Sequence, residues 1–271
     1  MGDRAMSKEL VKELFGANAA NYVVSDVHAK GASLARLVEL VGPGADWQGL
    51  DIATGGGHTA LVFAPHVKRM IASDLTREML DQVDKQVAEK GIGNVETKIA
   101  DAEALPFDDG SLDLVTCRIA PHHFPDIPKF VAEVHRVLKA GGTFALVDNA
   151  APDEATNPDF GAPELTEAAA TYNTFEKIRD PSHHRAWTTG EWLASIEEAG
   201  FKIEHTELLP KKMSFDTWIK NMSVPAEKVP GLAQMLNDAK PAFAAYIQKR
   251  EDEKGLGFTI AELLVIGRKA G

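Results

Sequence analysis

Short apolar segments alternate with stretches of helical periodicity over the first 150 residues of the chain. Five apolar runs have the length of a buried strand and lie at 48–53, 68–74, 95–100, 111–118 and 143–148. Apolar residues recur at helical spacing over 7–41, 76–90 and 127–139. Because strands that alternate with helices are typical of parallel sheets, the pattern predicts a doubly wound α/β fold.

Individual residues indicate where the helix at 127–139 begins and ends. Asp126 is of a type that caps helix starts, and Pro128 suits a first helical turn. Gly141 and Gly142 follow the periodic stretch, and glycine commonly ends a helix. We therefore expect the glycine pair to stop this helix.

The pattern loosens after residue 150. Thr188 and Glu191 resemble a capping box that opens a helix, and two last strands are expected at 201–208 and 258–268. Helices inserted over about 210–256 would separate these strands. We divide the chain into four segments: an N-terminal helical lid at 1–44, a core at 45–150, a second helical segment at 151–200, and the last two strands with their insertion at 201–271.

Composition narrows the class of partner. The 271 residues include 40 acidic and 29 basic side chains, for a formal net charge of −11. Binding to nucleic acid needs clustered Lys and Arg, so we expect no nucleic-acid partner. We favour a small-molecule partner, and a positively charged molecule would suit the acidic protein. No apolar run reaches the ~18–20 residues of a membrane span, and the first residues lack the apolar core of a signal peptide.

Cys117 is the single cysteine of the chain. It excludes an internal disulfide and a cysteine-cluster metal site. We therefore expect a protein of the reducing cytoplasm, either monomeric or homodimeric.

The most informative segment joins the first predicted strand to a glycine cluster. Residues 50–58 read LDIATGGGH, so a strand ends, three glycines follow and a helix begins. Glycines let a ligand approach the backbone closely, and the first turn of a helix presents free N–H groups. A tight turn alone would also explain the glycines.

Acidic residues accompany the ends of three consecutive strands. Asp51 lies in the end of the first, Asp74 ends the second, and Asp101 follows the third. A carboxylate after the second strand can accept hydrogen bonds from both hydroxyls of a ribose, as in dinucleotide-binding folds. The three acids therefore predict a nucleoside site.

This arrangement resembles the class I S-adenosylmethionine-dependent methyltransferases, in particular the type-11 group that includes enzymes of ubiquinone and menaquinone biosynthesis. The first motif of that family, D-x-G-x-G-x-G, is matched by Asp51, Gly55 and Gly57. Ala53 replaces the first glycine, which tightens the loop without removing it.

Further stretches extend the resemblance beyond the glycine loop. Residues 101–107 and 137–142 match the family pattern, and the segments FGANAANY, CRIAPHHF and RDPSHHR are similar to a group of bacterial methyltransferases. The resemblance implies a Rossmann-like sheet of seven strands, mostly parallel with the last strand antiparallel, flanked by helices and carrying a helical cap near the C-terminus. It also implies methyl transfer from S-adenosylmethionine to a small-molecule acceptor by in-line displacement, with S-adenosylhomocysteine as product.

The resemblance assigns roles along the predicted edge. The glycine loop is expected to hold the methionine end of the cofactor, Asp74 the ribose, Leu75 one face of adenine, and Asp101 with Ala102 the adenine edge. Arg118 is a candidate for the cofactor carboxylate. The full set of expected cofactor residues is Asp51, Ala53, Thr54, Gly55, Gly57, Asp74, Leu75, Asp101, Ala102, Glu103 and Arg118.

Two His-His pairs supply the candidates on the acceptor side. His122 and His123 follow the fourth strand, and His183 lies in a loop between two arginines, so these three are the candidate catalytic residues. Candidate substrate contacts are Tyr22, His28, Arg179, His184 and Trp187. Packing, helix capping or loop fixation is the alternative explanation for these residues. We expect no metal site, because adjacent histidines on a strand point in opposite directions.

Other function classes fit the sequence less well. A nicotinamide-dependent oxidoreductase would need G-x-G-x-x-G after the first strand, and a serine hydrolase would need G-x-S-x-G, but neither motif occurs. A protein that binds S-adenosylmethionine without transferring its methyl group remains an alternative.

Overall fold

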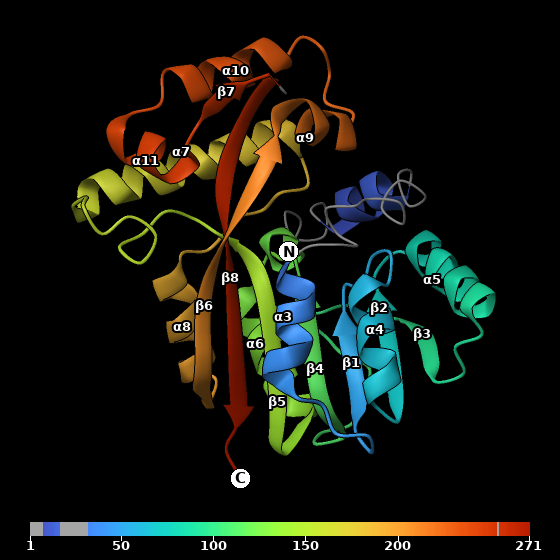
Figure 1. The fold of residues 1–271 in the computed structure, drawn as a ribbon. Helices are drawn as coiled ribbons and strands as arrows, with labels where there is room; N and C mark the ends of the chain where they lie inside the picture. Colours follow the sequence, from blue (N-terminus) through green and yellow to red (C-terminus); the bar gives the residue numbers. More distant parts are fainter. Residues whose placement is uncertain (1–7, 17–31, 254) are drawn as a thin grey trace.

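A single mixed sheet organises the molecule (Figure 1). The computed structural model describes residues 8–16, 32–253 and 255–271. The strands are β1 (Gln48–Ile52), β2 (Arg69–Asp74), β3 (Val95–Ile99), β4 (Leu112–Arg118), β5 (Leu138–Ala150), β6 (Phe201–Ser214), β7 (Arg250–Asp252) and β8 (Gly255–Lys269). Seven of them follow the order β3-β2-β1-β4-β5-β8-β6, and the short β7 pairs with β8.

The first five strands are all parallel, and β8 alone runs antiparallel to its neighbours β5 and β6. The predicted mostly parallel α/β fold with an antiparallel last strand is therefore confirmed, with β7 as an additional eighth strand. Strands β1 to β3 are added toward one edge of the sheet, and the chain then returns to place β4 on the other side of β1. The strand order therefore switches between β1 and β4, and such sheets bind ligands at the carboxyl ends of the strands beside this point.

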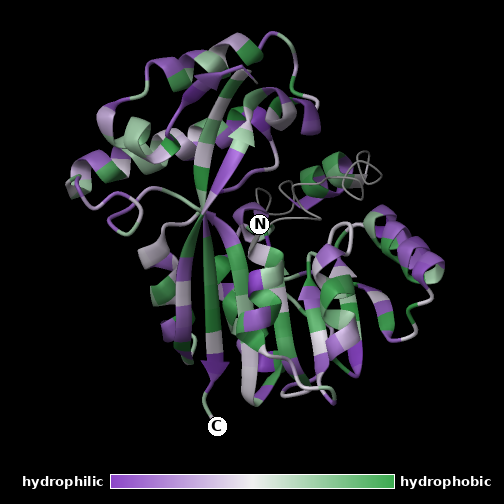
Figure 2. Ribbon diagram, viewed as in Figure 1, coloured by the Kyte–Doolittle hydropathy of each residue, from purple (hydrophilic) through white to green (hydrophobic). Residues whose placement is uncertain are grey.

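Helices cover both faces of the sheet. Beyond the helix at 8–16, they are α3 (Ala32–Val41), α4 (His58–Phe63), η1 (Ala64–His66), α5 (Arg77–Lys90), η2 (Pro121–His123), α6 (Ile127–Val137), α7 (Ala162–Arg179), α8 (Thr189–Glu198), α9 (Phe215–Asn221), α10 (Val229–Asn237) and α11 (Pro241–Ile247). Helices α3, α4 and α5 share one apolar cluster with the sheet, and α6 and α8 share another. In Figure 2 hydrophobic residues gather along the strands, whereas the outer turns of α5 are hydrophilic.

A helical cap stands on the extended ends of β6 and β8, which are 14 and 15 residues long (Figure 1). Helices α7, α9, α10 and α11 bury a third apolar cluster against these ends, with Trp218 stacked on Phe175 at a ring-centroid distance of 4.5 Å. The helices inserted between the last two strands thus pack as a unit with α7.

Two local predictions have different outcomes. The capping box of α8 is confirmed, since Thr188 Oγ1 accepts from the Glu191 N–H and Glu191 Oε2 accepts from the Thr188 N–H. The expected end of the helix at 127–139 is wrong. This helix stops at Val137 because Leu138 already pairs with Leu112 in the sheet, and the glycine pair lies inside β5.

Candidate functional site

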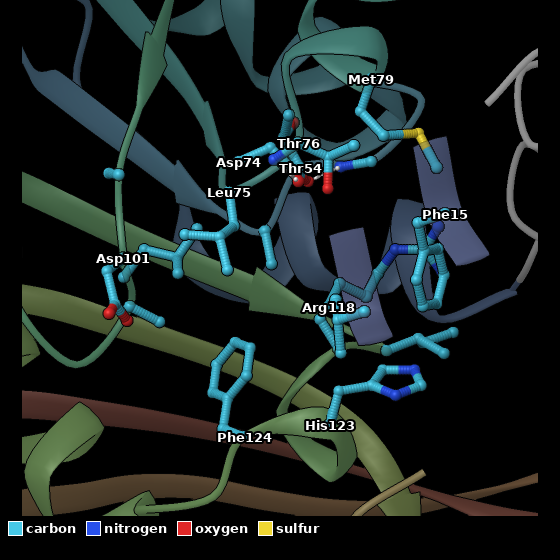
Figure 3. Close-up of a pocket in the computed structure, with 18 of the residues that line it drawn as sticks. Phe15, Thr54, Asp74, Leu75, Thr76, Met79, Asp101, Arg118, His123 and Phe124 are labelled. Atoms are coloured by element: carbon cyan, nitrogen blue, oxygen red, sulfur yellow. Dashed lines mark hydrogen bonds between the residues drawn. The ribbon is translucent and has the colours of Figure 1, made fainter. Parts of the chain in front are cut away.

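A cavity opens at the carboxyl ends of β1, β2 and β4, the edge at which the sequence predicted a nucleoside (Figure 3). It encloses about 1030 Å³ of empty space, part of which is open to solvent. Its walls come from the glycine loop, the end of β2, the loops after β3 and β4, and the helix at 8–16.

The glycine loop adopts a backbone that side chains disfavour. Ala53, Gly55 and Gly57 have φ angles of 51°, 52° and 80°. A Cβ added to Gly55 would meet no atom within 4 Å, so this glycine faces open space at the cavity wall. Ala53 holds the left-handed conformation without the freedom of glycine, which costs roughly 1–2 kcal/mol.

Asp51 lies beneath the loop rather than in the cavity wall. Its two carboxylate oxygens accept hydrogen bonds of 2.6 Å from the hydroxyls of Thr54 and Thr116. Burial raises the pKa of Asp51 to about 6, even though these hydroxyls favour the charged form. The structure therefore gives Asp51 the role of fixing the loop, and it does not bring Asp51 to the expected cofactor surface.

Asp74 joins the end of β2 to the glycine loop. Its Oδ2 accepts the Gly55 N–H and its Oδ1 accepts the Thr76 N–H, both at 2.9 Å. Each carboxylate oxygen retains a lone pair for a further donor, and the residue lines the cavity. Burial, opposed by these N–H groups, raises the pKa of Asp74. A ribose with two neighbouring hydroxyl donors fits this oxygen pair.

Asp101 and Glu103 meet the N-terminal helix. Lys8 Nζ lies 2.7 Å from Asp101 Oδ2 and 2.8 Å from Glu103 Oε2. Burial would raise the pKa of Asp101, but Lys8 and the Glu103 N–H, with a contribution from Lys129, together lower it. Leu75 and Ala102 complete this part of the wall, as expected from the sequence.

The end of β4 contributes a strained turn. Ile119 has a φ of 54°, which is unusual for a β-branched residue and is typical of functional sites. Arg118 precedes it, is buried, and reaches Thr59 Oγ1 with its Nε at 3.3 Å. The bend directs the chain from β4 into the wall of the cavity, which Ile119, Ala120 and His123 all line.

The candidate catalytic histidines differ in position. His123 lines the cavity and packs edge-on against Phe15, with ring centroids 5.0 Å apart (Figure 3). His122 and His183 are buried and do not line this cavity. His183 Nε2 instead lies 2.8 Å from Asn173 Oδ1 in the interior.

The candidate substrate residues also lie apart from the cavity where they are described. Arg179 Nε donates to the Trp218 carbonyl, and the Trp187 ring packs on Trp192. His184 has an exposed side chain. Tyr22 and His28 lie outside the described residues.

Sequence reasoning missed several lining residues. Lys8, Val11 and Phe15 come from the N-terminal helix, and Met79 and Phe124 complete apolar walls. The spacing of Val11 and Phe15, one helical turn apart, is a signal that could have indicated an apolar face directed at the site.

A glycine loop at the switch point of a mostly parallel sheet, with an acid at the end of the next strand, defines a protein that binds a nucleoside cofactor. The family model described as a methyltransferase domain matches residues 50–146. Over 259 residues the chain is 34% identical to the uncharacterized methyltransferase YcgJ of Bacillus subtilis strain 168, covering 94% of this chain and 97% of that protein. The chain belongs to the S-adenosylmethionine-dependent methyltransferases.

Two further relatives agree with this assignment. A crystal structure of a protein of Bacillus halodurans C-125 named as a methyltransferase superposes with a TM-score of 0.80 at 38% identity, covering 89% of this chain and all (100%) of that one. The ubiquinone/menaquinone biosynthesis C-methyltransferase UbiE of Rickettsia prowazekii is 35% identical over 179 residues, 63% of this chain and 65% of that protein. The resemblance to type-11 methyltransferases and the expected cofactor are confirmed.

Two features are absent from the described residues. They contain no group of three or more His, Cys, Asp or Glu side chains placed to hold a metal ion. No helix among them combines the length and apolar character needed to cross a membrane.

Proposed function

We propose that this methyltransferase acts on a small-molecule acceptor by in-line displacement. The observation that carries the proposal is the junction of Asp74 with the glycine loop at one end of a cavity whose other end is walled by apolar side chains and His123. When bound, S-adenosylmethionine supplies a methyl group already activated by its positively charged sulfur.

The residues that would hold the cofactor follow the order of the strands. Thr54 and Gly55 would surround the methionine end, with Arg118 near its carboxylate, whereas Gly57 is buried and does not line the cavity. Asp74 and Leu75 would take the ribose and one adenine face, and Asp101, Ala102 and Glu103 would lie along the adenine edge. Ala53 and Asp51 would act on this site by fixing the loop.

The remaining wall suits a mechanism that positions the acceptor and excludes water from it, without a fixed catalytic triad. Val11, Phe15, Ile119 and Ala120 are apolar and exclude water beside the reacting atoms. His123 is the polar group among them and would orient the nucleophile. Small size of the acceptor is supported by the N-terminal helix, whose Val11 and Phe15 wall the cavity beside His123.

Calorimetry followed by a turnover assay tests the proposal. We expect both S-adenosylmethionine and S-adenosylhomocysteine to bind, and a panel of small molecules assayed with methyl-labelled cofactor to include labelled products. Binding with no transfer to small molecules, but with transfer to added protein or RNA, would contradict the small-molecule acceptor. Failure of both ligands to bind would contradict the site.

A further inference from the structure

The two His-His segments meet in one buried cluster behind the cavity. The ring centroid of His122 lies 4.3 Å from that of His123 and 5.5 Å from that of His183. The carbonyl oxygen of His122 accepts the N–H groups of His184 and Arg185 at 2.8 and 3.0 Å. The turn after β4 and the loop after α7 are thus held as one unit.

His122 is paired with a buried carboxylate in this cluster. Asp148, fully buried in β5, places Oδ1 2.6 Å from His122 Nδ1. Glu176 on α7 and Asp180 in the loop that follows also face this ring. Burial alone would lower the pKa of His122, but these carboxylates, with Asp148 first, raise it. A buried carboxylate is costly without a cationic partner, and His122 supplies one.

The hydrogen bonds of His123 fix which of its nitrogens carries the proton. His123 Nδ1 lies 3.2 Å from both the carbonyl oxygen and the Oγ of Ser182. The Ser182 hydroxyl donates its hydrogen to Asp180 Oδ1, and a carbonyl oxygen only accepts. Nδ1 therefore carries the hydrogen and Nε2 has the lone pair. Nε2 is 3.9 Å from Asp180 Oδ2, beyond hydrogen-bond distance.

Burial and the neighbouring His122 together set the charge state of His123. Burial and then the neighbouring His122 lower the pKa of His123 to about 4, with a further contribution from Arg179 and against the attraction of Asp180. Near neutral pH the ring at the cavity wall is therefore uncharged.

We propose that Asp148 is a positioning residue that acts through His122: the ion pair keeps the adjacent His123 ring, which lines the cavity, uncharged and able to accept a hydrogen bond through Nε2. This assigns the methyl acceptor to molecules whose reacting atom bears a hydrogen, such as a hydroxyl, an amine or a thiol. A carboxylate or phosphate would need a protonated ring. The class of methyl acceptor rests on the proposed function, whereas the charge state of the His123 ring does not.

The test is a pH titration of the nine histidines by NMR, with ¹³C-labelled histidine and no cofactor present. His123→Gln and His122→Gln identify the two signals. In the unaltered protein we expect the His123 signal to titrate near pH 4 and the His122 signal to titrate above the ordinary range of histidine. Asp148→Asn retains an oxygen for Nδ1 but removes the charge that holds His122 protonated.

The expected result for Asp148→Asn is a rise of the His123 midpoint by about one pH unit or more, a tenfold change in proton affinity, since a like charge at this distance shifts a pKa by ~1–3 units. The exposed Asp159→Asn is the matched control and leaves the midpoint unchanged. An unchanged His123 midpoint in folded Asp148→Asn would overturn the proposal. If that variant does not fold, His122→Gln replaces it, with the same rise expected and the same contradiction if the midpoint stays.

Binding of S-adenosylhomocysteine is measured separately on the same samples. Its failure in the unaltered protein would contradict the proposed function and leave the titration result standing. The two claims therefore fail independently.

Discussion

The buried Asp51 carboxyl makes the stability of this protein depend on pH in a direction opposite to that of most paired acids. The folded protein holds the pKa of Asp51 at about 6, above its ordinary value of 3.8. Between these two values the folded state binds the proton that the unfolded state has lost. The free energy of unfolding therefore falls as pH rises through this window.

The magnitude follows from the difference of the two values. A shift of about two units corresponds to about 3 kcal/mol at 1.36 kcal/mol per unit, nearly all of it lost between pH 4 and 8. Asp51→Asn removes the titrating group. One threonine hydroxyl can still donate to the Asn oxygen, and Thr116 Oγ1 can turn to Leu50 O, which lies 3.4 Å away.

Urea unfolding from pH 4 to 8, without cofactor, measures the effect. The difference in free energy of unfolding between Asp51→Asn and the unaltered protein should move by about 2–3 kcal/mol in favour of the variant as the pH rises. The exposed Asp108→Asn provides the control and should show no such trend. Parallel curves for Asp51→Asn and the unaltered protein would refute the account of a charge buried beneath the loop.

Three further results are expected. Ala53→Gly should raise the stability by roughly 1 kcal/mol, seen as a higher Tm, because glycine relieves the left-handed backbone; a lower Tm would contradict the strain. Cys117 is buried with its pKa raised well above the ordinary value by burial, so a thiol reagent should modify it only at the rate of unfolding, and rapid modification of the native protein would be inconsistent with this. Lys8→Met removes the ion pairs to Asp101 and Glu103 and should speed amide exchange in the N-terminal helix severalfold with little change in Tm, because partly exposed pairs contribute roughly 1 kcal/mol or less; unchanged exchange would show that the contact does not hold the helix.

The part of the site that follows from strand ends could be predicted, because parallel strands bring their carboxyl ends to one edge whatever lies between them. Asp74 and the glycine loop are examples. The role of Asp51 could not be predicted, because one of the hydrogen bonds that its carboxylate accepts comes from Thr116, 65 positions away in the sequence. The helix end at Val137 was set in the same way, by pairing of the next residue with a distant strand.

The acceptor side depended still more on tertiary contacts. The sequence presented two His-His pairs but gave no sign that they pack together, or that a carboxylate from β5 would pair with one ring and leave the other at the cavity. His183 and Arg179 face the interior because Asn173 and the Trp218 carbonyl bind them there, which no local pattern encodes.

The central claim is that Asp74 binds the ribose of the cofactor at the glycine loop. Calorimetry of S-adenosylhomocysteine with Asp74→Asn tests it most directly, with the exposed Asp84→Asn on α5 as control. We expect at least a tenfold rise in Kd for Asp74→Asn, since hydrogen bonds to a charged group contribute ~1.5–3 kcal/mol each, and no change for the control. Equal Kd values for folded Asp74→Asn and the unaltered protein would contradict the account.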